Sequence, residues 1–133
     1  MNPHYPQAAL RAGHRCEYCC APEAVFNFPF EVEHIIPVSR GGVDAEFNWA
    51  LACRSCNLRK AAHINGIDIE SKTIIRLFDP RKDCWNKHFR ADTESGEING
   101  LTAIGRVTVD QLDVNSEAQL SARRQWMHLD LFP

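Results

Sequence analysis

Two Cys-x-x-Cys pairs, Cys16–Cys19 and Cys53–Cys56, constrain the fold of this chain more than any other feature of its sequence. The turn inside each pair lets both sulfurs face one ion at about 2.3 Å, so that together the pairs can surround a zinc ion as a tetrahedron. A site filled by four thiolates has no open coordination position and cannot activate water. The pattern therefore predicts a structural Zn²⁺ site that ties two distant segments together.

The remaining cysteines and a nearby histidine leave alternatives open. Cys20 and His14 are near enough to compete as zinc ligands, but two complete Cys-x-x-Cys pairs already fill a tetrahedron, so we favour a small buried thiol and a surface histidine. Cys84 has no partner cysteine nearby and is predicted to be a buried thiol. The alternative for the two pairs themselves is four reduced, buried cysteines without a metal.

Composition and charge limit the class of protein. A chain of 133 residues is ordinary for one globular domain. Its six cysteines suit metal ligands in a reducing compartment better than three disulfides, and no apolar run is long enough to cross a bilayer. We therefore expect a cytoplasmic protein without a membrane partner. The net charge of −2 gives no overall signature of a nucleic-acid binder, so contacts with phosphates must come from local clusters.

The first half of the chain predicts two strands and a helix between and after the cysteine pairs. A short helix over residues 6–13 has proline in its first turn and glycine at its end. Residues 32–35 end a strand rich in aromatic and β-branched residues, and residues 37–48 form a loop whose glycine pair permits unusual backbone angles. Residues 49–52 predict a second strand, and residues 55–62 predict a helix.

The second half predicts a small antiparallel sheet and a terminal helix. A turn-rich connection over residues 64–72 leads to a strand over residues 73–78. Residues 84–90 and 97–101 resemble a β-hairpin. Residues 102–112 could form a helix or a strand, and Thr102 as an N-cap favours the helix. Residues 116–129, which begin at a serine, predict a terminal helix.

Basic and aromatic side chains alternate in residues 81–90, where Arg81, Lys82, Lys87 and Arg90 accompany two aromatic residues. Such a mixture could lie along a nucleic-acid backbone. We favour the alternative that the aromatic side chains belong to the core and the charged ones face water.

Residues 14–62 resemble the HNH endonuclease family, in which an acid–histidine pair ends a first strand, an asparagine follows a loop, and a histidine or asparagine lies on the next helix. In this sequence the matching residues are Glu33-His34, Asn48 and Asn57. The resemblance is greatest to the zinc-stabilised members, which carry one Cys-x-x-Cys before the strand and one at the helix start. It implies an α+β fold with a ββα-metal (His-Me finger) core held by a zinc site of four cysteines.

The resemblance also implies a role for each residue of the motif. His34 would be the general base, because a neutral imidazole can accept a proton from water near neutral pH. Glu33 and Asn57 would offer oxygen ligands to one catalytic divalent cation such as Mg²⁺. Asn48 would fix the loop and thereby orient His34, and Lys60 would reach a phosphate as a point charge.

Two positions differ from the commonest form of the motif, and each role has a simpler alternative. Glu33 stands where the family often has aspartate, and Asn57 stands where it often has histidine, but both retain an oxygen ligand that suits a hard cation. His34 could instead be a hydrogen-bonded histidine at a strand end, and Asn48 could cap the next element.

These observations predict one α+β domain over residues 1–133, with a nuclease core at residues 14–62 and an extension at residues 63–133 that packs on it. The predicted function is metal-dependent hydrolysis of phosphodiester bonds in DNA, with RNA as an alternative substrate. The competing hypothesis is a non-catalytic zinc module that binds nucleic acid or protein. A module that only binds would not need an acid, a histidine, two asparagines and a lysine in this order.

Overall fold

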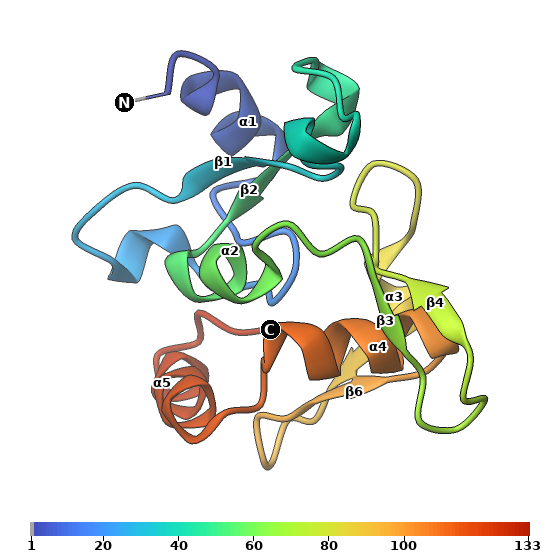
Figure 1. Cartoon of the computed structure of the whole chain (residues 1–133). Coiled ribbons are helices and arrows are strands. Elements are labelled where there is room, and N and C mark those ends of the chain that lie inside the picture. The colour runs from blue at the N-terminus through green and yellow to red at the C-terminus, as the bar shows by residue number, and fades with distance from the viewer. Residues whose placement is uncertain (1) are drawn as a thin grey trace.

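Three separate two-stranded antiparallel sheets, with helices packed around them, make up residues 2–133, the part of the chain that the computed structural model describes (Figure 1). The first sheet pairs β1 (Glu31–His34) with β2 (Trp49–Ala52). All four residues of β2 are buried, because a strand of one tryptophan, one leucine and two alanines can be covered on both faces. The predicted α+β fold class is confirmed.

One helix precedes this first sheet in the sequence, and another follows it. Helix α1 (Tyr5–Arg11) has proline in its first turn and contacts β2. Helix α2 (Arg54–Lys60) starts directly after β2, and the thiol of Cys53 caps it by accepting a hydrogen bond from the backbone N–H of Cys56 at 3.5 Å. The unit β1–β2–α2 therefore matches the two strands and the helix predicted for residues 32–62.

The predicted loop between β1 and β2 contains two short 3₁₀ helices, Val38–Arg40 and Glu46–Asn48. Gly41 ends the first of these with a φ of +86°, a conformation that side chains other than glycine's disfavour. At Gly42 an added Cβ would lie 1.7 Å from the carbonyl oxygen of Ile36. The glycine pair therefore lets the loop fold back closely on the end of β1.

The second half of the chain departs from the predicted boundaries in two places. Residues 64–72, predicted to be a connection, contain strand β3 (Asn65–Ile67), which pairs with β4 (Ile74–Arg76). Residues 84–90, predicted to be a strand, begin with a helical turn, α3 (Trp85–His88), before β5 (Phe89–Ala91).

The rest of the predicted hairpin and both predicted C-terminal helices are present. Strand β5 pairs with β6 (Ile98–Gly100). Helix α4 (Ala103–Leu112) begins where the Thr102 hydroxyl accepts a hydrogen bond from the N–H of Gly105 at 3.1 Å. Helix α5 (Glu117–His128) begins in the same way at Ser116. None of the helices in residues 2–133 combines the length and apolar character needed to cross a membrane.

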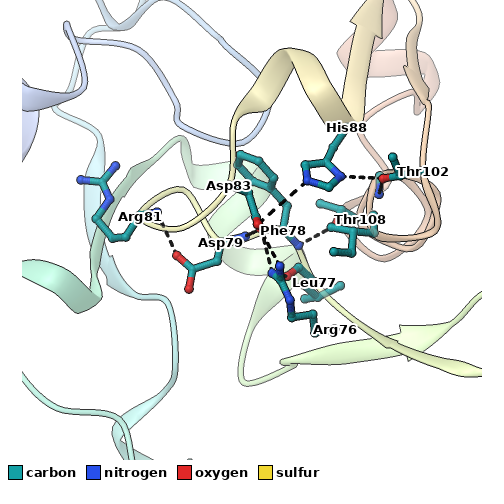
Figure 2. A network of polar contacts seen from close by, with 11 residues as sticks. Arg76, Leu77, Phe78, Asp79, Arg81, Asp83, His88, Thr102 and Thr108 are labelled. Carbon is teal, nitrogen blue, oxygen red and sulfur yellow. Dashed lines mark hydrogen bonds and ion pairs between the residues drawn. The ribbon is translucent and has the colours of Figure 1, made fainter.

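A polar network joins β4 to α3 and α4 (Figure 2). Asp83 accepts two hydrogen bonds from the Arg76 guanidinium, at 2.7 and 2.8 Å, and one from the backbone N–H of Asp79 at 2.9 Å. His88 lies 3.9 Å from the same carboxylate and hydrogen-bonds the Thr102 hydroxyl at 2.6 Å. The network therefore connects the β3–β4 hairpin to the N-cap of α4.

The two halves of the chain contact each other through the first Cys-x-x-Cys turn. The indole N–H of Trp85 donates to the backbone oxygen of Tyr18 at 2.8 Å, and Arg81 pairs with Glu17. Helix α2 also contacts α4 (Figure 1). There Arg59 pairs with Asp113 at 2.8 Å. Side chains of residues 14–62 and 63–133 share one cluster of buried apolar residues.

Candidate metal centre and catalytic cleft

The four paired cysteines meet in one buried cluster. The sulfurs of Cys16, Cys19, Cys53 and Cys56 all lie within 4.8 Å of one another, and the Sγ atoms of Cys19 and Cys53 are 3.7 Å apart. Four sulfurs at about 2.3 Å from a zinc ion would be about 3.8 Å apart in a regular tetrahedron. The spacing and burial of these thiols therefore fit a structural zinc ion.

Hydrogen bonds within this cluster shift the pKa values of its members, and burial shifts the pKa of a neighbouring arginine. Hydrogen bonding to the Cys16 thiol raises the pKa of Cys19 and of Cys56 and lowers the pKa of Cys53. Burial lowers the pKa of the Arg123 guanidinium, while the charges of Cys19 and Cys56 oppose that effect. The fully buried Arg123 on α5 thus places a positive charge near the thiolates.

The other candidate ligands lie outside the cluster, as predicted for His14 and Cys20. His14 hydrogen-bonds the carboxylate of Glu23 at 2.7 Å, and burial raises the pKa of Cys20 to about 12. The prediction that Cys84 is buried is wrong, because its side chain is exposed where the chain enters α3. In residues 81–90, Phe89 is buried and Trp85 packs against the core, as expected of the aromatic side chains. Arg81 does not face water as expected, because it pairs with Glu17 and its side chain is only 15% exposed.

A cleft of about 600 Å³ runs along β1 and the adjoining face of α2. Glu33, His34 and Asn57 all line it, and so does Glu31. The remaining walls come from Val32 of β1, from Ala61 at the end of α2, and from the start of the chain and the segments before and after β1, namely Asn2, Tyr5, Pro29, Phe30, Pro37 and Val38. The fold thus brings three of the predicted site residues to one open surface.

Within the cleft, Glu33 lies at the buried end and forms an internal ion pair. Its carboxylate accepts hydrogen bonds from the Tyr18 hydroxyl and, at 3.1 Å, from the Lys60 ammonium. Burial raises the pKa of Glu33, and the charge of Lys60 opposes this shift. Lys60 is itself only 1% exposed, so it is placed inside the protein and not at the surface expected of a lysine that contacts phosphate.

His34 is partly exposed and is held by a carboxylate from the loop. Its Nε2 lies 3.0 Å from Oδ1 of Asp44, and the same oxygen accepts a hydrogen bond from the Trp49 indole at 2.9 Å. The bond to His34 lowers the pKa of Asp44, which keeps this carboxylate ionised. Among residues 2–133, none hydrogen-bonds the other ring nitrogen, Nδ1.

Asn48 is buried and connects the two ends of the loop. Its side-chain oxygen accepts from the N–H of Ile36, and its amide nitrogen donates to the carbonyl oxygens of Ile36 and Val43, each at 2.9 Å. These bonds fix the backbone just after His34 and just before Asp44. The amide therefore occupies the position from which it can organise the loop.

Asn57 projects from α2 towards β1 but meets a different glutamate from the predicted one. Its side-chain amide donates to the carboxylate of Glu31, which also pairs with Arg54 at 3.3 Å. Glu31 and Glu33 share one face of β1 because alternate residues of a strand point the same way. Sequence reasoning missed Glu31, and its spacing of two from Glu33 was the available signal.

The segment that carries the cysteine cluster and the cleft resembles a known protein family. Residues 16–63 match the family model described as HNH endonuclease, and this range contains both cysteine pairs, β1, β2 and α2. This segment is similar to HNH endonucleases. No curated protein and no solved structure matches the chain significantly.

The similarity to HNH endonucleases implies a ββα-metal core, which β1, β2 and α2 match, and a nucleic acid as the substrate class. HNH domains are generally nucleases. The donor set of the cleft fits the divalent cation that such a core uses, because carboxylate and amide oxygens are the ligands that Mg²⁺ and Mn²⁺ prefer. All four cysteines of the buried cluster also lie within the residues that match the HNH family.

Proposed function

We propose that this protein is a metal-dependent endonuclease that hydrolyses phosphodiester bonds in DNA. The observation that carries the proposal is the shared cleft, which brings His34, Asn57 and the glutamates of β1 to one open surface of a segment similar to HNH endonucleases. A module that only binds nucleic acid would not need a histidine beside oxygen donors in a cleft.

His34 acts as the general base in this proposal. The contact with Asp44 engages Nε2 and leaves Nδ1 free to accept a proton from the attacking water. The Asn48 hydrogen bonds support this geometry by holding the loop that carries Asp44. A base oriented by a second group in this way is a recurring feature of hydrolytic sites.

Glu33 and Asn57 are the proposed protein ligands of one catalytic cation, Mg²⁺ or another divalent ion. When bound, the ion would neutralise charge on the scissile phosphate and stabilise the leaving oxygen. Lys60 holds the carboxylate of Glu33 and the carbonyl oxygens at the end of β1, so its proposed role is to position this strand end. The exposed Arg54, one turn before Asn57, is available to a DNA phosphate.

The test is cleavage of a supercoiled plasmid by the zinc-loaded protein with Mg²⁺ or Mn²⁺. His34→Ala should lower the nicking rate at least about 100-fold, the contribution typical of a general base, with unchanged zinc content. His128→Ala, an exposed histidine at the end of α5, serves as the matched control and should cleave like the wild type. Equal nicking by wild type and His34→Ala would refute the proposal, and so would zinc-loaded wild type that binds DNA without cutting it.

A further inference from the structure

Asn57 and Glu31 meet across the cleft, where the Asn57 amide donates a hydrogen bond to the Glu31 carboxylate, and both residues line it. The Glu31 side chain is 35% exposed, so a solvated ion can reach its carboxylate from the open side. Its other partner, Arg54, lies at 3.3 Å with a side chain that is 62% exposed. An exposed ion pair of this kind is weak and is easily replaced.

Glu33 is more deeply buried than Glu31. Its carboxylate already accepts hydrogen bonds from Tyr18 and Lys60, and its side chain is 6% exposed. The Lys60 ammonium also donates to the carbonyl oxygens of Ile35, at 2.8 Å, and His34, at 3.4 Å, so it is fixed in place. A cation bound directly at Glu33 would therefore lie close to a buried positive charge that cannot withdraw.

We propose that Glu31, in place of Glu33, is the carboxylate ligand of the catalytic cation, together with Asn57; this inference rests on the proposed nuclease function and changes only its ligand assignment. A half-turn of the Asn57 amide replaces its nitrogen by its oxygen on the side that faces Glu31. Two neighbouring oxygen ligands of an octahedral Mg²⁺ or Mn²⁺ are about 3 Å apart, which is close to the separation of two hydrogen-bonded groups. After this half-turn, a divalent ion could lie between the amide oxygen of Asn57 and the carboxylate of Glu31 with little further movement of either side chain.

The experiment measures Mn²⁺ binding to the zinc-loaded full chain by electron paramagnetic resonance, in the absence of DNA. Glu31→Gln keeps the size of the side chain and one acceptor oxygen but removes the charge, and it should raise the Kd for Mn²⁺ at least tenfold. Glu94→Gln, an exposed glutamate in the β5–β6 turn, is the matched control and should bind like the wild type. Zinc content and the thermal unfolding midpoint should be the same in all three proteins.

Wild-type affinity in Glu31→Gln would overturn the inference, and so would an absence of Mn²⁺ binding by the wild type. Its failure is distinguishable from failure of the proposed function. If His34→Ala abolishes nicking while Glu31→Gln binds Mn²⁺ normally, the nuclease stands and Glu31 is not a ligand. If Glu31→Gln loses Mn²⁺ while His34→Ala nicks normally, the cation site stands and the proposed base does not.

Discussion

At the scale of single residues, the ion pair between Lys60 and Glu33 dominates the inner end of the cleft. Both side chains are almost completely buried, and their charged atoms are 3.1 Å apart. Charges inside a protein cost several kcal/mol each to desolvate, and close pairing offsets that cost only while both partners are present. The pair therefore makes each residue depend on the other.

Lys60→Met should lower the free energy of unfolding by roughly 3–5 kcal/mol, because it leaves the Glu33 carboxylate buried without a counter-charge. The double variant Lys60→Met/Glu33→Gln should be less destabilised than the sum of the two single variants. Urea unfolding at neutral pH measures both effects. Arg59→Met on the same helix is the control, since the Arg59–Asp113 pair is exposed and should be worth at most about 1 kcal/mol. A loss of under about 1 kcal/mol in Lys60→Met would contradict the argument.

At the scale of secondary-structure elements, Asp83 joins the β3–β4 hairpin to α3 and α4 (Figure 2). Its side chain is 9% exposed, and the hydrogen bonds from Arg76 lower its pKa to about 2. A carboxyl whose pKa falls below the unfolded value of about 3.9 stabilises the fold above that value. This stabilisation is lost as the pH falls from about 4 to about 2.

Asp83→Asn should therefore cost about 2 kcal/mol of unfolding free energy at pH 7, and the difference from the wild type should shrink as the pH approaches 2. Urea titrations at pH 7, 4 and 2.5 provide the measurement. Asp110→Asn, an exposed carboxylate on α4, should leave the stability within about 0.5 kcal/mol at every pH. A deficit in Asp83→Asn that does not change with pH would show that the ionised carboxylate is not the source of the stability.

Secondary-structure elements differ in how far local sequence signals could predict them. Strand β2 and helices α4 and α5 were predictable because apolar runs and capping residues are local signals. Strand β3 was missed because Asn65 and Gly66 are turn formers, and only the pairing with β4 makes them a strand. In the cleft, the motif supplied His34 and Asn57, whereas the contacts of Asp44 and Glu31 depend on how the loop and α2 pack against β1.

At the scale of the whole molecule, the cysteine cluster lies where the two halves of the chain meet. The turn between Cys16 and Cys19 carries Tyr18, whose backbone oxygen binds Trp85 of the second half. On the other side, the buried Arg123 donates to the backbone oxygens of Val114, at 2.7 Å, and Gly96, at 2.9 Å, which lie before α5 and β6. Loss of an ion held by the four thiols should therefore affect both halves together.

Cys53→Ser tests this dependence, because it removes one thiol of the cluster while the serine hydroxyl can still cap α2. Structural zinc contributes about 10–16 kcal/mol in small zinc-binding folds, which is comparable to the entire stability of a domain, so the variant and the chelated wild type should both be largely unfolded. Circular dichroism and elemental analysis measure folding and zinc content. Cys84→Ser, an exposed thiol outside the cluster, should retain one zinc ion and the wild-type unfolding midpoint.

The extent of unfolding distinguishes one cooperative domain from a core with an independent extension. Because buried side chains of residues 14–62 and 63–133 share one cluster, amide signals from α4 and α5 should lose their dispersion at the same chelator concentration as those from β1 and β2. Heteronuclear NMR of the wild type during titration with a zinc chelator resolves the two sets of signals. Dispersed signals for residues 63–133 after those of the first half have collapsed would show that the extension folds without the zinc-bound core, and the prediction of a single domain would then be wrong.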